Sequence, residues 1–144
     1  MAAEKLPELL QTNYRSDLNL FVGRWGYQPA SELLSRTYEQ LTQRALECGC
    51  RFWLQDIRRR AFNDPDITRW LLTSYFPQMA TSLGGRLHVA YLTSPTLLET
   101  IVNGSGYVLP GAYENSPFVI AFFSTENNAM EWLHQAQGRE LLTS

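Results

Sequence analysis

The sequence predicts a single α/β domain: a mixed sheet of about five strands with about four helices. Two short strand-like runs near the N-terminus are separated by a turn, which indicates a hairpin. Helical and strand-like segments then alternate, as is typical of β-α-β units and a largely parallel sheet. The 144 residues fit one domain, residues 1–144, with a core from about 12 to 137. A chain of this length buries roughly 70% of its unfolded surface, enough for a core without disulfides or metals.

The hairpin and the first helix occupy the first third of the chain. Strands are expected at residues 12–14 and 18–25, and Gly23 is expected to weaken the second strand or to mark a bulge. Apolar residues recur with helical spacing over residues 31–48, so a helix is expected there. Ser31 is placed to cap its first turn.

The rest of the chain alternates strand and helix three times. Asp64, Pro65 and Asp66 form a helix start, because Asp caps the first turn and Pro suits the first helical position. Pro77 is expected to end or kink that helix. The segments are expected, in the order strand, helix, strand, helix, strand, helix, at residues 51–57, 64–77, 86–93, 94–104, 118–123 and 125–137.

Composition and charge exclude several classes of function. A net charge of −2 argues against bulk nucleic-acid binding and against electrostatic docking to an anionic membrane. No apolar run approaches the length of a membrane span, and residues 1–10 lack the apolar stretch of a signal peptide. Cys48 and Cys50 are too close in sequence for an unstrained disulfide, so reduced thiols and a cytoplasmic location are expected.

The sequence contains none of the common phosphate-binding, nucleotide-binding or catalytic motifs. The chain has no GxxxxGK, GxGxxG, HExxH or GxSxG sequence. Asp56, Asp64 and Asp66 cluster near the C-terminal end of one strand, at the sheet edge where α/β proteins bind ligands, but Asp64 and Asp66 are already explained as helix-start residues. We therefore expect no catalytic residue, no cofactor and no metal. An enzyme would need a polar constellation around Asp56 and His88 in one cleft.

Three consecutive arginines, Arg58 to Arg60, are the most unusual local feature. They are either a solvated loop paired with nearby aspartates or a recognition patch, because guanidinium groups bind carboxylate and phosphate in a bidentate manner. As a docking surface for a protein partner, the patch would comprise Asp56, Arg58, Arg59, Arg60, Asp64, Asp66 and Trp70. The alternative is a small-ligand or lipid-binding pocket lined by Trp25, Trp53, Trp70 and Tyr91.

Four segments together resemble the small bacterial STAS-like proteins (sulphate transporter and anti-sigma-factor antagonist). They are YRSDLNL with GRW in the hairpin, WLQDIRRR, AYLTSP, and AFFSTE through AMEWL, at residues 14–25, 53–60, 90–95 and 121–133. The resemblance implies a non-enzymatic regulatory module that binds a partner protein. Antagonists of that family carry a phosphorylated serine at a helix start. Residues 63–68 here contain no serine, and Thr68 is the nearest hydroxyl. A homodimer is also possible, because the hairpin leaves an open sheet edge.

Overall fold

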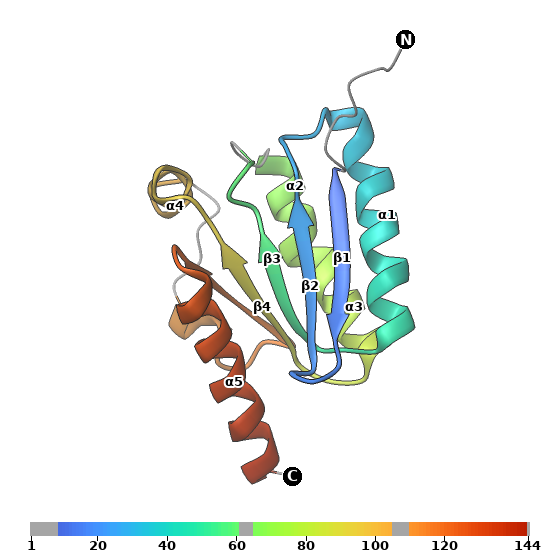
Figure 1. The fold of residues 1–144 in the computed structure, drawn as a ribbon, viewed down its shortest axis with the longest axis vertical. Coiled ribbons are helices and arrows are strands. Elements are labelled where there is room, and N and C mark those ends of the chain that lie inside the picture. Colours follow the sequence, from blue (N-terminus) through green and yellow to red (C-terminus); the bar gives the residue numbers. More distant parts are fainter. Residues whose placement is uncertain (1–8, 61–64, 105–109, 144) are drawn as a thin grey trace.

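The computed structural model describes residues 9–60, 65–104 and 110–143 and has the expected α/β fold class. Five strands form one sheet in the order β1-β2-β3-β4-β5 (Figure 1). Strand β1 is antiparallel to β2, and every later neighbour is parallel. The strands are β1 Leu10–Arg15, β2 Leu20–Trp25, β3 Phe52–Asp56, β4 Leu87–Leu92 and β5 Phe118–Phe123.

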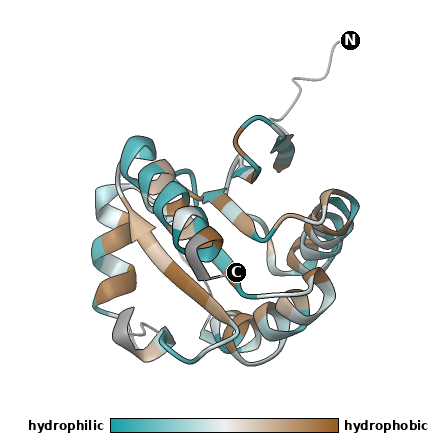
Figure 2. Cartoon of the chain, turned by 90° about the horizontal axis from the view of Figure 1, so that it is seen from below, coloured by the Kyte–Doolittle hydropathy of each residue, from teal (hydrophilic) through white to brown (hydrophobic). Residues whose placement is uncertain are grey.

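Helices cover both faces of this sheet. Helices α1 and α3 pack on one face and α5 packs on the other, against β3, β4 and β5 (Figure 1). Figure 2 shows strongly apolar colour along a strand in the interior of the fold, and every residue of β3 and β4 is buried, as expected for a sheet covered on both faces. The helical segments are α1 Ser31–Cys48, α2 Pro65–Trp70, the π-helical turn η1 Leu71–Tyr75, α3 Phe76–Leu83, α4 Pro95–Val102, the 3₁₀ turn η2 Pro110–Tyr113 and α5 Glu126–Thr143.

Alternation along the strands assigns side chains to the two layers. Trp25 of β2 contacts Tyr38 of α1 at 5.4 Å between ring centroids, which places the odd-numbered residues of β2 and β3 under α1 and α3. Trp132 of α5 contacts His88 and Phe123 at 5.9 and 5.7 Å, which places them in the opposite layer. All residues of β3 and β4 are buried, so these two strands form the centre of the domain.

Two expectations about helix ends need correction. Pro77 was expected to end or kink its helix, and it does not end it: α2, η1 and α3 run on to Leu83, with the π-helical turn η1 directly before Phe76 and Pro77. The N–H of Phe76 bonds to the carbonyl of Leu71, one residue further back than in an α-helix, and this wider turn makes room for a proline ring that offers no N–H. Ser31 is not the cap of α1 either, because the capping position is Ala30, whose side chain makes no capping bond.

Gly23 marks no bulge, because the register between β2 and both its neighbours is unbroken. A Cβ atom at Gly23 would lie 2.8 Å from Nε2 of Gln55, closer than real contacts allow. The absent side chain therefore leaves space for buried Gln55, whose Oε1 accepts a 3.1 Å hydrogen bond from Nε1 of Trp25. Within the three described ranges, no helix is both long and apolar enough to span a bilayer.

Candidate functional site

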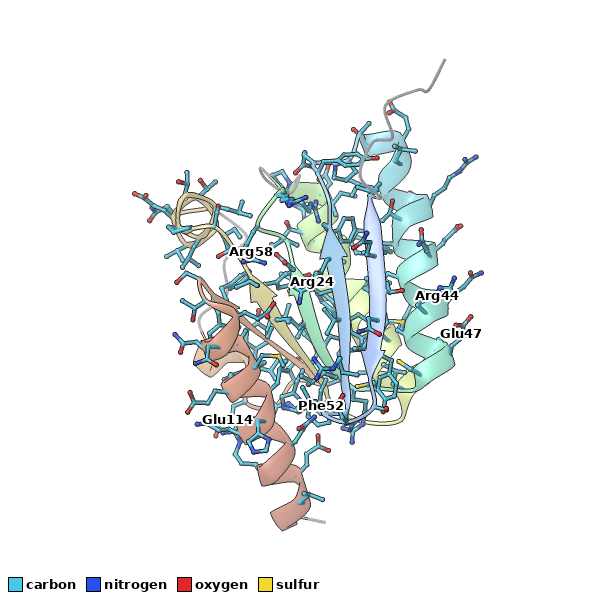
Figure 3. The ribbon with its side chains drawn as sticks, viewed as in Figure 1. Arg24, Arg44, Glu47, Phe52, Arg58 and Glu114 are labelled. Carbon is cyan, nitrogen blue, oxygen red and sulfur yellow. The ribbon has the colours of Figure 1, made fainter. Side chains whose placement is uncertain are left out.

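A cleft of about 490 Å³ lies at the carboxyl ends of β2 and β3, where the arginine run begins. Figure 3 shows Arg24 and Arg58 near one another at this end of the sheet. Position 11 takes part because β1 runs antiparallel and therefore begins where β2 and β3 end. We call this the carboxyl-edge cleft; its lining residues are Gln11, Arg24, Trp25, Gly26, Asp56, Arg58 and Arg59.

Asp56, the last residue of β3, organises the charges of the cleft. The guanidinium of Arg58 forms a fork of two hydrogen bonds to the carboxylate, from Nε to Oδ1 at 3.0 Å and from Nη2 to Oδ2 at 2.8 Å. The backbone N–H of Arg58 also donates to Oδ1. Arg24 donates from Nη1 to Oδ2 at 2.8 Å. The same Arg24 nitrogen lies 2.8 Å from Glu126 at the start of α5. Both oxygens of Asp56 are thus occupied, and the carboxylate serves to orient two guanidinium groups.

Ionisation of these groups follows from the same contacts. Burial alone would raise the pKa of Asp56, but the hydrogen bonds from Arg58 and Arg24 outweigh it and hold the pKa below its ordinary value. Hydrogen bonding to Asp56 raises the pKa of Arg58. Burial would lower the pKa of Arg24, yet its bonds to Glu126 and Asp56 raise it. Asp56 is therefore a fixed anion of low basicity, poorly suited to accept a proton.

The three arginines point to different environments. Arg58 and Arg59 are exposed at the cleft, and the side chain of Arg59 makes no hydrogen bond or ion pair with any described residue. Arg60 is only 5% exposed, and its guanidinium lies over the ring of Trp25 at 4.6 Å from the centroid. Arg60 therefore belongs to the interior, and the exposed part of the run is two residues long.

The remaining residues of the expected docking surface are spread out. Helix α2 begins at the same edge of the sheet at which β3 ends (Figure 1). Asp66 is exposed there and lies 3.8 Å from Arg69, while Asp64 lies outside the described residues. Trp70 is 40% exposed and packs on Tyr38 at 5.5 Å.

The aromatic residues expected to line one pocket do not form one. Trp53 is completely buried, with its ring edge-on to Phe21 and Nε1 donating to a backbone carbonyl. Tyr91 is buried and stacks on Phe122 at 5.4 Å. Trp25 and Trp70 are linked only indirectly, since each contacts Tyr38. Trp53 and Tyr91 therefore act as core residues.

A second pocket, of about 680 Å³, lies between α1 and the continuous α2-η1-α3 segment. Trp70 contributes to its wall, and apolar side chains predominate there. We call it the helix groove; its apolar lining consists of Leu34, Leu46, Ile67, Trp70 and Met79, with Tyr38 and Tyr75 beside them. The hydroxyls of Tyr75 and Thr42 bond to one another at 2.9 Å, so these polar groups are already satisfied.

Other groups with chemical potential lie away from the cleft. His88 and Asp56 share one sheet face, but His88 pairs with Phe52, four residues from Asp56 along β3, a separation of roughly 13 Å. Burial lowers the pKa of His88 to about 4. Burial raises the pKa of Cys50 to about 11, so its thiol stays protonated near neutral pH. In the ranges that the structure describes, no three His, Cys, Asp or Glu side chains gather as metal ligands would.

Arg24 and Glu126 are the residues that sequence reasoning missed. Each is separated from Asp56 in the chain, and only the parallel register that sets Arg24 opposite Asp56 brings the first pair together. A charged residue within the apolar run LFVGRW was the available signal. The sequence matches no protein-family model and no curated protein.

Proposed function

We propose that this protein is a non-enzymatic regulatory interaction module, similar to STAS domains, that docks an acidic segment of a partner protein at the carboxyl-edge cleft. The observation that carries the proposal is the fork between Asp56 and Arg58, which presents an oriented guanidinium beside Arg59, whose side chain forms no ion pair with any described residue. Pre-oriented guanidinium groups bind carboxylates with little further loss of side-chain freedom.

The charges in the cleft favour an acidic partner. Three guanidinium groups, of Arg24, Arg58 and Arg59, face two carboxylates, of Asp56 and Glu126. The excess positive charge is local, since the whole chain is acidic. Both oxygens of Asp56 already accept hydrogen bonds from arginines, so Asp56 is poorly placed to accept a proton as a general base. This supports binding rather than catalysis.

Reversal of the Arg59 charge tests the proposal. Arg59→Glu should weaken binding of a fluorescent peptide of alternating glutamate and alanine roughly three- to tenfold, and added salt should weaken wild-type binding, because exposed charges act through a screened field. Fluorescence anisotropy measures both effects. The matched control is Arg36→Glu on α1, the same charge change at another exposed arginine without a described partner. Equal weakening by both variants would mean that the cleft is not the docking site.

The helix groove supports a second candidate function, the binding of an apolar small molecule or lipid chain. Its apolar wall and exposed Trp70 are suited to such a ligand. Native mass spectrometry of freshly purified protein should then show an adduct, and Leu46→Glu at an exposed site in the wall should remove it. A bare protein mass, without thermal shift on adding fatty acids or phospholipids, would count against this function.

A further inference from the structure

Strand β1 leaves one edge of the sheet open. Among the described residues, no strand pairs with its outer side, and Figure 1 shows it at the margin of the sheet beside α1. Edge strands are usually protected by a bulge, a proline or a charge. The register of β1 with β2 has no bulge, and residues 10–14, LQTNY, contain neither proline nor charge. This edge is therefore competent to pair with another strand.

The backbone groups on this open edge can be assigned. The N–H of Gly26 donates to the carbonyl of Leu9 at 2.8 Å, just before Leu10 and Trp25, the first pair of the ladder. In an antiparallel pair, bonding residues alternate along each strand. The N–H and C=O groups of Leu10, Thr12 and Tyr14 must then point outward, away from β2.

A groove of about 1020 Å³ follows this edge and is lined by every residue of β1. One wall is formed by α1, where Arg44 and Glu47 project outward (Figure 3) and pair at 3.2 Å. Arg15 in the groove is likewise paired with Asp17 at 2.7 Å. Arg24 also lines the groove and pairs with Asp56 and Glu126, each at 2.8 Å. The charges of the groove are thus matched within the chain, so a copy of the same surface meets no uncompensated like charge.

We propose that a second copy of this chain adds its β1 to this edge, antiparallel and about a two-fold axis at Thr12. Centring the axis there sets Leu10 opposite Tyr14 of the second copy and pairs the outward backbone groups of both strands. A stretch without charge and a charge-matched groove suit a self-complementary contact better than a strongly acidic or basic peptide. The dimer does not depend on the function proposed for the carboxyl-edge cleft, although Gln11 and Arg24 line both the groove and the cleft.

The expected dimer is weak. A standard interface uses roughly 20–30 residues on each side, and the groove offers fewer. We expect dissociation in the micromolar range, measurable by sedimentation velocity of the full chain from about 1 to about 300 µM.

Two matched double variants test the register. The two-fold axis sets exposed Gln11 opposite exposed Asn13 of the second copy, on the same face of the sheet. Gln11→Glu with Asn13→Glu places like charges opposite each other twice, whereas Gln11→Glu with Asn13→Lys places opposite charges there. The dissociation constants of these variants should differ at least tenfold, with the second variant the tighter. Equal constants, or a wild-type chain that stays monomeric at the highest concentration, would overturn the proposal.

Proline substitutions give an independent test. Thr12→Pro removes an outward N–H and should abolish dimerisation while circular dichroism shows an intact fold. Asn13→Pro removes an N–H that bonds to β2, and it should destabilise the monomer instead. A Thr12→Pro protein that dimerises as the wild type does would contradict the pairing.

Discussion

His88 should make the stability of this protein strongly dependent on pH below neutrality. Its side chain is only 5% exposed, and its ring stacks on Phe52 at 5.2 Å and meets Trp132 edge-on. Its buried Nδ1 has no hydrogen-bond partner among the residues that the structure describes. Burial is the main reason that the pKa falls from 6.5 to about 4; neighbouring charges add to it, with Arg86, Arg139 and Arg51 lowering the pKa and Glu140 raising it.

The direction and size of the effect follow from proton linkage. Between pH 6.5 and pH 4 the unfolded chain binds a proton at His88 that the folded chain does not, so stability falls as pH falls through this window. A shift of this size corresponds to about 3 kcal/mol in total, of which about 2 kcal/mol is lost between pH 7 and pH 5. Above pH 7 the contribution of His88 is fully present.

Urea unfolding of His88→Phe and of the wild type at several pH values isolates this contribution. Phenylalanine keeps an aromatic ring against Phe52 and cannot be protonated. The free energy of unfolding of the variant relative to the wild type should therefore rise by about 2 kcal/mol from pH 7 to pH 5. The control is His134→Phe, which changes an exposed histidine on α5. Parallel curves for His88→Phe and the wild type over this range would refute the reasoning.

Two further predictions concern the core. Gly23→Ala should destabilise the fold by about 1–2 kcal/mol in urea unfolding, because its Cβ would displace buried Gln55 from Trp25. Gly138→Ala is the matched control. It should stabilise α5 by about 0.5–1 kcal/mol, because nothing lies within 4 Å of the added atom and alanine is the better helix former. A similar loss of stability in both variants would contradict the proposed displacement of Gln55. Iodoacetamide at pH 8 should modify half-buried Cys48 well before Cys50, as mass spectrometry of peptides would show; modification of both at the same rate would contradict the burial of Cys50.

The order of helices and strands could be predicted because the spacing of apolar residues within each segment indicates its secondary structure. The helical spacing over 31–48 and the apolar run FVIAFF are local properties of the chain. The π-helical turn before Pro77 was not predictable in this way. Tertiary contacts stabilise the helix through the proline. One of them is between Phe76 and Phe118 of β5, whose ring centroids lie 5.6 Å apart.

The candidate site was predictable in place but not in composition. The carboxyl end of β3 was expected to matter, and Asp56, Arg58 and Arg59 do line a cleft there. Sequence spacing alone did not show that Arg60 turns inward over Trp25, because the direction of each side chain depends on the turn that follows the strand. Nor did it show Arg24, which reaches Asp56 only through the pairing of β2 with β3.

The role expected for Asp56 from the sequence differs from the role that its contacts in the structure indicate, and the Asp56→Asn variant distinguishes the two. In sequence it is a candidate ligand-binding residue; in the structure both its oxygens hold arginines. The neutral variant should lose about 1–3 kcal/mol of stability at pH 7, where the carboxylate is ionised, and this difference should shrink as pH falls through the lowered pKa of Asp56. Loss of the fork that orients Arg58 should also lower its affinity for the acidic peptide, by less than Arg59→Glu does, because one negative charge leaves the cleft at the same time. Lost affinity with unchanged stability in urea would instead make Asp56 a direct contact of the ligand.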